Sequence, residues 1–288
     1  MSYGYGKQQK HQPRSRRRPS GISLRLIMAV GIVAFSVISY MTKSDINEVT
    51  GEKQRVSMDE DQEIALGLQA APPMAQEHGG LYQDRRAQEI VDQVGIRLLN
   101  ALSSELAKKN VEIPYPFEFH LLADERTINA FALPGGQVFI TYALYNKLES
   151  EGQLAGVLGH EIGHVIERHG AERMAKQGLV KGVVGAAGVF GGDANTARIA
   201  KMVTDFKLME YGRDDELESD RWGVMLTALA GYNPRSMLGV MDILAASAGP
   251  GGPPEMMSTH PKPANRKPYI EDRIKEFFPE GLPPGLRD

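Results

Sequence analysis

Residues 160–164 read His160-Glu161-Ile162-Gly163-His164, and the rest of the chain is best understood outward from this stretch. On an α-helix, side chains four residues apart lie on the same face, so His160 and His164 can direct their imidazole nitrogens at one metal ion. Glu161 projects about a quarter-turn away, close enough to contact a water bound to that metal. The pattern therefore predicts a catalytic metal site on a helix.

The alternative is a chance match, with two surface histidines on an ordinary amphipathic helix. Residues 152–176 are helical in pattern, and an apolar stripe runs beside the two histidines. Gly159 and Gly163 each precede one of the two histidines and indicate close packing, because glycine otherwise weakens a helix. This context favours the arrangement of zinc peptidases, in which one helical turn supplies two ligands and a general base.

His169 lies nine residues after His160, on the opposite face of this predicted helix, so we do not expect it to bind the metal. The longer metzincin pattern requires glycine at 167 and histidine at 170, where this chain has Glu167 and Gly170, which excludes that subclass. Three other histidines have no ligand-like spacing and are interpreted as incidental: His11, His78 and His120.

Composition indicates a globular protein, with 42% hydrophobic and 24% charged residues in a chain of 288. The net charge of −3 and the lack of a basic, aromatic-rich face predict that nucleic acid is not a partner. There is no cysteine, so histidines and carboxylates must hold any metal, a donor set that favours a catalytic over a structural site.

The N-terminus predicts a membrane anchor. Residues 1–21 are basic and polar, and residues 22–41 are apolar apart from Arg25 and a few small polar side chains. About 20 such residues can cross a bilayer as a helix. No small-residue cleavage site precedes Lys43, so a retained anchor is favoured over a removed signal peptide. The basic cluster predicts a cytoplasmic tail at 1–21 and export of everything after residue 41.

Beyond the anchor, we expect a linker at 42–56, one domain at 57–275 and an unstructured tail at 276–288. A capping box at 57–60 predicts a helix that runs toward residue 71 and is stopped by Pro72 and Pro73. Pro134-Gly135-Gly136 predicts a hairpin between strands 128–133 and 138–142, beside a strand at 117–122. Further helices are expected at 81–108, 150–176, 197–230 and 234–246. The glycine-rich segment 178–192 is interpreted as a packed or mobile lid near the site, with a membrane contact as the alternative.

A catalytic zinc usually takes a third protein ligand, and an acidic cluster follows the motif. Glu216 and Asp220 are four residues apart and so share a helix face. Glu216 could bind the metal while Asp220 accepts a hydrogen bond from a ligand histidine. By spacing alone Glu216 is only weakly preferred over its neighbours, and the cluster could also be a solvated helix surface.

Four motifs together resemble the family of membrane-associated zinc peptidases that includes the CAAX prenyl protease and the heat-shock protease HtpX. Within it, the chain most resembles the branch of the periplasmic β-barrel assembly-enhancing and mitochondrial overlapping-activity proteases. The resemblance covers roughly residues 45–275. It rests on residues 129–136 (Asn-Ala-Phe-Ala-Leu-Pro-Gly-Gly), on the 160–164 helix followed by Arg168-His169, on Glu216-Leu-Glu-Ser-Asp220, and on Thr259-His260-Pro261 with Arg266. Ser219 stands where this family usually has alanine.

The resemblance implies a mostly helical α+β, gluzincin-like peptidase domain with one zinc ion, a small β-sheet and one preceding transmembrane helix. The ligands of the zinc ion would be His160, His164 and Glu216, and Glu161 would be the general base. Asp220 would orient a ligand histidine. His260 would either stabilise the oxyanion or occupy the fourth metal position as a latch. The edge strand that flanks the active-site helix would hold an extended peptide through residues Asn129, Ala130, Phe131, Ala132 and Leu133.

The function implied is hydrolysis of misfolded or unassembled exported proteins, with the domain in the periplasm of a bacterium. A mitochondrial setting is less favoured, because no amphipathic transit helix is evident. Two alternatives stay open: a chaperone that binds unfolded polypeptides without cleaving them, and a latent enzyme closed by His260 or by the glycine-rich segment. The oligomeric state is not predicted.

Overall fold

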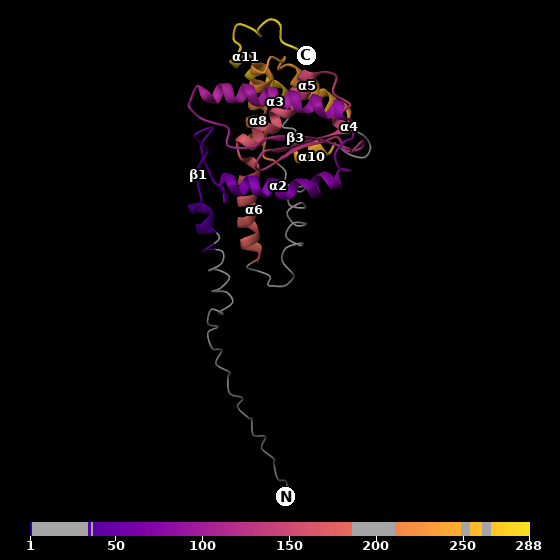
Figure 1. Ribbon diagram of the computed structural model, residues 1–288. Coiled ribbons are helices and arrows are strands. Elements are labelled where there is room, and N and C mark those ends of the chain that lie inside the picture. Colours follow the sequence, from indigo (N-terminus) through magenta and orange to yellow (C-terminus); the bar gives the residue numbers. More distant parts are fainter. Residues whose placement is uncertain (2–33, 36, 186–210, 249–253, 261–265) are drawn as a thin grey trace.

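The computed structural model describes residues 1, 34–35, 37–185, 211–248, 254–260 and 266–288, with the backbone alone for 179–185. Helices dominate, and they surround a small mixed sheet (Figure 1). This confirms the predicted mostly helical α+β class. The strands are β1 (Asp45–Ile46), β2 (Lys53–Gln54), β3 (Glu118–Leu122), β4 (Ala130–Leu133) and β5 (Gln137–Thr141). The helices are α2 (Glu60–Glu77), α3 (Arg85–Ala107), α4 (Tyr142–Tyr145), α5 (Glu151–Ile166), α6 (His169–Gly185), α8 (Arg213–Leu229), α9 (Ser236–Ala246), α10 (Glu255–Thr259) and α11 (Arg266–Phe277).

The main sheet has the order β3-β5-β4, with β3 parallel and β4 antiparallel to β5. The predicted hairpin is confirmed, because β4 and β5 are joined by the turn at Gly135 and Gly136. Both glycines have positive φ angles, of 81° and 101°, a conformation that side chains with a Cβ disfavour. A Cβ on Gly135 would also lie 2.4 Å from the Cα atom of Ile64 in α2. The turn therefore needs glycine for its backbone and for the helix that crosses it.

The sheet is covered on both faces, which explains why all of β5 is buried. Val138 and Ile140 belong to the large core that includes residues of α3 and α5. Phe139 points to the other face, where it joins a smaller cluster with Ala70 and Met74 of α2. Figure 1 shows α2 and α3 on opposite sides of the strands. Because successive side chains of β5 point to opposite faces of the sheet, this strand packs against helices on both sides.

Helix α5 lies at the centre of the molecule. Every residue in it except Glu151 is buried, and it packs against α8 as well as α3, α9 and β4. Ser150 begins the helix by accepting a hydrogen bond from the Gln153 backbone nitrogen, as N-cap serines do. The alternative of two surface histidines on an ordinary amphipathic helix is therefore wrong, because both histidines lie on a buried helix.

The prediction that Pro72 and Pro73 stop the first helix is wrong. Helix α2 continues through both prolines to Glu77, and its N-cap is Asp59, paired with Gln62 in a capping box. Ala70 and Met74, on either side of the prolines, are buried against the sheet. Packing of this face outweighs the backbone hydrogen bonds that the prolines remove.

The single helix predicted at 150–176 is also wrong, because α5 ends at Ile166 and α6 begins at His169. Arg168 between them has a φ of 54°, in the left-handed region. Its buried guanidinium bonds Glu63 of α2, with Nε 2.8 Å from Oε1, and Asp45 of β1, with Nη1 2.9 Å from Oδ2. These ion pairs, formed with residues more than 100 positions away, hold the strained turn.

The predicted linker and tail are both tied to the body. β1 and β2 form a hairpin in which Asn47 Nδ2 donates to the Ile166 carbonyl at 2.7 Å. Gln54 Nε2 donates to the Glu167 carbonyl at 2.6 Å, so this hairpin satisfies carbonyls that the end of α5 leaves free. Near the C-terminus, Arg287 exchanges backbone hydrogen bonds with Gly231 and Asn233, of 3.0 and 2.7 Å.

Parts of four predictions lie outside the described residues. Of the basic tail predicted at 1–21, only residue 1 is described. The anchor at 22–41 is described only from residue 34, and no helix in the described part of the chain is long and apolar enough to span a membrane. The glycine-rich segment 178–192 is described only to residue 185, as the end of α6. Of the helix predicted at 197–230, the structure describes α8.

Candidate active site

The two motif histidines direct the same ring atom at one point. His160 Nε2 and His164 Nε2 lie 3.1 Å apart, and both side chains are buried on α5. Burial lowers the pKa of His164 well below its usual value, which keeps the ring in its neutral, metal-binding form. The helix therefore presents two nitrogen donors together, as the four-residue spacing predicts.

Helix α8 crosses α5 closely enough to bring Glu216 to these nitrogens. A Cβ on Gly159 would meet the Cα of Gly223 at 3.3 Å, and one on Gly163 would meet the Cα of Ser219 at 3.0 Å. Glu216 Oε1 lies 3.5 Å from His164 Nε2, and Glu216 Oε2 lies 3.6 Å from His160 Nε2. Gly159 and Gly163 thus let the two helices pack closely, as their positions beside the histidines indicated.

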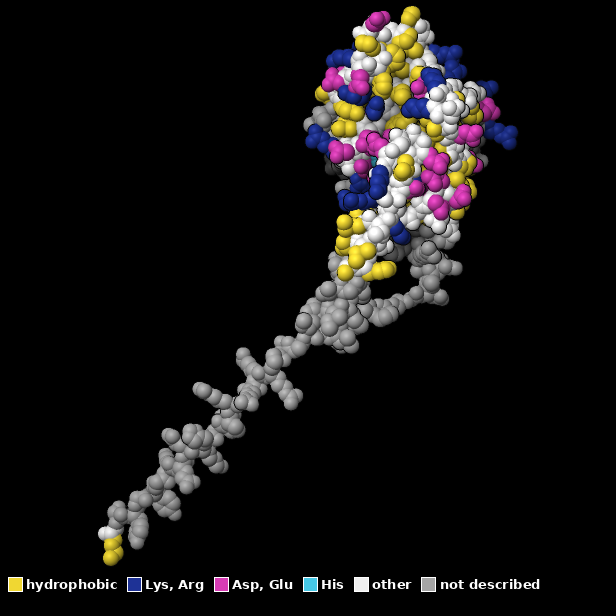
Figure 2. Space-filling model, turned by 90° about the vertical axis from the view of Figure 1, so that its left-hand side faces the viewer, with side chains coloured by type: hydrophobic (Ala, Val, Ile, Leu, Met, Phe, Trp, Pro, Cys, Tyr) yellow, Lys and Arg dark blue, Asp and Glu magenta, His cyan; other side chains and the backbone are white. Residues whose placement is uncertain are grey.

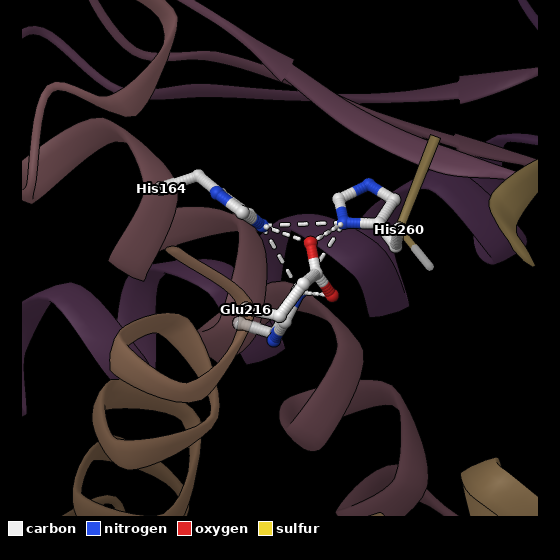
Figure 3. A group of neighbouring side chains, drawn as sticks. His164, Glu216 and His260 are labelled. Carbon is white, nitrogen blue, oxygen red and sulfur yellow. Dashed lines mark hydrogen bonds and ion pairs between the residues drawn. The ribbon is translucent and has the colours of Figure 1, made fainter. Parts of the chain in front are cut away.

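His260 completes the cluster from the end of α10 (Figure 3). Its Nδ1 atom lies 2.9 Å from Glu216 Oε1, 3.2 Å from His164 Nε2 and 3.4 Å from His160 Nε2. Donor atoms of all four residues lie within 4.8 Å of one another, and all four are buried. Donors placed about 2.0–2.1 Å from a tetrahedral zinc are about 3.3–3.4 Å apart, so these separations fit such an ion.

Glu161 lies beside the cluster without joining it. Both of its carboxylate oxygens are buried and have no hydrogen-bond partner among the described residues. Oε1 is 3.7 Å from His260 Nε2, and burial raises the pKa of the carboxyl group. A buried carboxylate without a partner is costly unless something binds there, so this orphaned group also fits a metal-bound water or substrate.

Asp220 lies beside His160 and can orient its ring. Its Oδ1 atom is 3.1 Å from His160 Nδ1, on the far side of the ring from the cluster. Arg266 of α11 contacts Asp220 Oδ1 at 2.6 Å through Nη2, and Glu216 Oε2 at 2.8 Å through Nη1. Burial alone would raise the pKa of Asp220, but the Arg266 charge and the hydrogen bond with His160 lower it. Arg266, given no role from the sequence, thus neutralises two acids of the site.

The statement that His169 faces away from the motif is wrong. Because the chain turns at Arg168, the His169 ring lies beside His164, with the two Nδ1 atoms 3.0 Å apart. It contacts the outer nitrogen of a candidate ligand rather than the cluster itself. A left-handed residue inside a helical pattern leaves no periodic signal, so the spacing argument could not find this contact.

Tyr211 is a second residue that sequence reasoning missed. Its ring stacks on His164, with centroids 3.9 Å apart, and its backbone nitrogen donates to the Thr259 carbonyl at 3.0 Å. Burial raises its pKa, so the phenol keeps its proton. Tyr211 therefore covers one side of the cluster and ties α8 to the segment that carries His260. Nothing in the sequence distinguishes it from the other tyrosines.

Four of the five predicted substrate-binding residues, all except Ala130, line a pocket that reaches the cluster. Asn129, Phe131 and Leu133 line it together with His260, and β4 is an edge of the described sheet. Met74 of α2 and His78 also line the pocket. Asn129 Oδ1 is buried and has no hydrogen-bond partner among the described residues. The pocket thus combines an apolar floor with an unsatisfied acceptor beside the cluster.

Comparison with known proteins places these features in a family. The model of a family described as Peptidase family M48 matches residues 86–274, a range that holds all four clustered residues. The beta-barrel assembly-enhancing protease of Yersinia pestis is 30% identical over 240 residues, 76% of this chain and 45% of that protein. The protease of the same name from Escherichia coli (strain K12) is 30% identical over 200 residues, 66% of this chain and 41% of that protein.

A eukaryotic relative agrees. The mitochondrial metalloendopeptidase OMA1 of Arabidopsis thaliana is 33% identical over 148 residues, 51% of this chain and 29% of that protein. The chain spans less than half the length of each of these three relatives. Since the family model covers more than half of the chain, and since the relatives agree with it, the chain belongs to peptidase family M48.

Proposed function

We propose that the protein is a zinc-dependent endopeptidase that hydrolyses peptide bonds in misfolded or unassembled exported and membrane proteins. The observation that carries this proposal is Glu161, a buried carboxylate with two free oxygens beside three candidate ligands. A site that only held a structural metal would not need this group, whereas a hydrolase needs a general base there.

His160, His164 and Glu216 would hold one zinc ion, which when bound supplies acidity to a coordinated water and polarises the scissile carbonyl. Glu161 takes a proton from the attacking water and delivers it to the leaving amine. Its raised pKa suits both halves of this transfer, because the group must be able to hold the proton between them. Asp220 keeps the His160 ring oriented through Nδ1.

His260 was given two roles, and the distances support the latch. Its Nδ1 lies among the ligand atoms, 2.9 Å from Glu216 Oε1, at the position that water would take in an active site. The free Nε2, 3.7 Å from Glu161 Oε1, is where it could stabilise an oxyanion after the ring moved. These distances support the alternative of a latent enzyme, which would become active when His260 leaves the cluster.

The substrate would be an extended polypeptide. β4 is an edge of the described sheet, and a peptide that added to it would pass the mouth of the pocket that leads to His260. Pairing with a strand edge reads mainly backbone, which suits unfolded proteins of varied sequence. The names of the relatives, a beta-barrel assembly-enhancing protease and a mitochondrial metalloendopeptidase, agree with envelope and organelle protein quality control.

The location that fits this role is the bacterial inner membrane, crossed once, with the N-terminus in the cytoplasm and the peptidase domain in the periplasm. Phe35, Ile38 and Met41 are each more than half exposed. Figure 2 shows apolar side chains gathered where the described part of the chain meets the grey N-terminal trace. The rest of that face mixes acidic and basic side chains, which agrees with the absence of nucleic acid among the proposed partners.

The test is digestion of unfolded casein by the full chain loaded with zinc, beside Glu161→Gln and the exposed control Glu112→Gln. We expect the unfolded substrate to displace His260 from the cluster, so that the wild type and the control cleave casein, whereas Glu161→Gln binds zinc without cleaving. Equal cleavage by all three would indicate a contaminating protease and contradict the assignment of the base.

His260→Ala separates the remaining alternatives. If the wild type is inactive, cleavage by His260→Ala that disappears in the double variant with Glu161→Gln would establish the latent enzyme. Zinc binding with no cleavage by any variant, but with tight binding of unfolded casein, would instead favour the chaperone.

A further inference from the structure

The two candidate ligand histidines differ in what holds their outer ring nitrogen. His160 Nδ1 lies 3.1 Å from a carboxylate oxygen of Asp220, the arrangement that the sequence predicted. His164 Nδ1 lies 3.0 Å from a nitrogen of another imidazole, Nδ1 of His169. No carboxylate within the described residues contacts His164 Nδ1 directly. The second ligand is therefore supported by a different device from the first.

Hydrogen positions around this pair follow from the requirements of the site. His164 must present a lone pair on Nε2 to bind a metal, so its proton lies on Nδ1. That N–H can donate only if His169 Nδ1 offers a lone pair, which places the His169 proton on Nε2. His169 Nε2 lies 3.0 Å from Glu218 Oε2, an acceptor in the right place for that proton. This one placement of protons gives each ring nitrogen of His169 and Nδ1 of His164 a hydrogen-bond partner.

His169 itself is fixed by the structure around it. It is buried, it begins α6, and it follows the left-handed turn that the ion pairs of Arg168 hold. Ser219 adds a further contact, with Oγ 3.4 Å from His169 Nδ1. The Glu218 side chain, by contrast, is half exposed. The chain His164-His169-Glu218 therefore runs from the candidate metal centre to solvent through a ring with little freedom.

We propose that His169 is a positioning residue, which sets the tautomer and the ring orientation of His164 and connects it to Glu218 at the surface. The inference rests on the proposed metal site, because it takes His164 as a ligand. Partners of this kind typically change metal affinity by about 10- to 100-fold when they are removed. His160 does not share this dependence, because Asp220 and Arg266 hold it from the other side.

Two substitutions separate this role from simple packing. His169→Leu fills similar space but can neither accept from His164 nor donate to Glu218. His169→Gln keeps an amide oxygen that can accept and an amide N–H that can donate, so it can rebuild the relay. His120→Leu is the matched control, a partly buried histidine that contacts Gln137 and stacks on Phe139 away from the cluster.

The first measurement is zinc affinity of the full chain by competition with a chromophoric chelator. We expect His169→Leu to bind zinc about 10- to 100-fold more weakly than the wild type. His169→Gln should recover most of that loss, and His120→Leu should match the wild type. Circular dichroism of the metal-free variants checks that each is folded.

The second measurement does not depend on metal. Nitrogen-15 spectra of the histidine rings in the metal-free chain report which nitrogen carries the proton. We expect His164 to be protonated on Nδ1 in the wild type and in His169→Gln, and to lose that single tautomer in His169→Leu. A wild-type chain with His164 protonated on Nε2, or a folded His169→Leu with unchanged tautomer and zinc affinity, overturns the proposal. Failure of the wild type to bind zinc would instead count against the proposed function.

Discussion

At the scale of single residues, the three buried carboxylates of the site differ in what lies against them. Arg266 contacts two of them, Glu216 at 2.8 Å and Asp220 at 2.6 Å. Glu161 has no hydrogen-bond partner among the described residues, and burial raises its pKa. Burial alone would raise the pKa of Glu216 and of Asp220, but His260 and, to a smaller extent, Arg266 lower it for Glu216, and Arg266 lowers it for Asp220. At Glu161 the effect of burial dominates.

Removing Arg266 should destabilise the protein strongly, since breaking a buried ion pair from one side costs about 3–5 kcal/mol. We expect Arg266→Met to lower the free energy of unfolding by about that amount in urea denaturation with a chelator present. Arg221→Met is the control, because Arg221 is exposed and lies over the Phe277 ring, a contact worth about 1 kcal/mol or less. An equal decrease in the free energy of unfolding in the two variants would show that the buried ion pairs of Arg266 do not stabilise the protein more than an exposed contact does.

Asp124 gives a pH-dependent prediction away from the metal cluster. Burial alone would raise its pKa, but hydrogen bonds from Thr127, Arg126 and His78 outweigh this effect and lower the pKa well below the usual value of an aspartate. A lowered folded pKa means that stability is fully present above about pH 4 and is lost as pH falls through the folded pKa. We expect Asp124→Asn to be less stable than the wild type at pH 7.

The difference between wild type and Asp124→Asn should shrink as pH falls below about 4, because the Asp124 carboxylate of the unfolded wild-type chain then takes up a proton, while the folded chain, with its lowered pKa, does not. Urea denaturation between pH 3 and pH 7 measures it. A difference that stays constant across this range would mean that the charge of Asp124 is not what stabilises the loop.

At the scale of elements, the crossing of α5 and α8 sets the geometry of the ligands. A Cβ on Gly163 would meet Trp222 Cβ at 2.9 Å and Ser219 Cα at 3.0 Å, so any larger residue must push the helices apart. The two candidate ligand histidines lie on one of these helices and Glu216 on the other. Separation of the helices would therefore separate the donors.

Gly163→Ala should lower the free energy of unfolding by about 1–3 kcal/mol, as overpacking usually does, and should weaken zinc binding. Gly178→Ala is the matched control on α6, where a Cβ would meet nothing within 4 Å. It should be neutral or stabilise by up to about 1 kcal/mol, because alanine is the better helix former. Thermal unfolding and chelator competition on both variants check this, and equal effects would contradict the close crossing.

The sequence was informative wherever the signal was local. The spacing of His160 and His164 and the turn at Gly135 depend on a few neighbouring residues, and the structure agrees with both. The errors occurred where distant packing overrides local preference. The sheet carries α2 past its prolines, and distant carboxylates hold Arg168 in a left-handed turn. The partners of His169 depend on that turn, so no periodicity could place them.

At the scale of the whole molecule, the candidate ligands belong to three separate segments. His160 and His164 come from α5, Glu216 from α8, and His260 from the end of α10. A metal bound to all of them would join these segments in the folded state alone. Binding that favours the native state stabilises it by about 2.7 kcal/mol when free ligand is 100 times the dissociation constant.

Removal of zinc should therefore lower the thermal midpoint of the full chain, and added zinc should raise it in proportion to the logarithm of its concentration. His260→Ala should show a smaller shift, because one donor is lost, and Glu216→Gln a smaller one still. Calorimetry with and without a chelator measures this. A wild-type thermal midpoint that does not change with zinc concentration would mean that the cluster does not bind zinc.

The wide spacing of the site along the chain also determines when it can first exist. His164 and His260 are 96 residues apart, so at about 5–20 residues per second synthesis takes roughly 5–20 s to pass from one to the other. Glu216 precedes His260 by 44 residues, yet its charge is balanced by Arg266, which follows His260 by only six. The imidazole that closes the cluster thus leaves the ribosome just before the cation that stabilises it. His260 is therefore already synthesised when Arg266 becomes able to contact Glu216, so the histidine that could close the cluster precedes the cation that stabilises this candidate ligand.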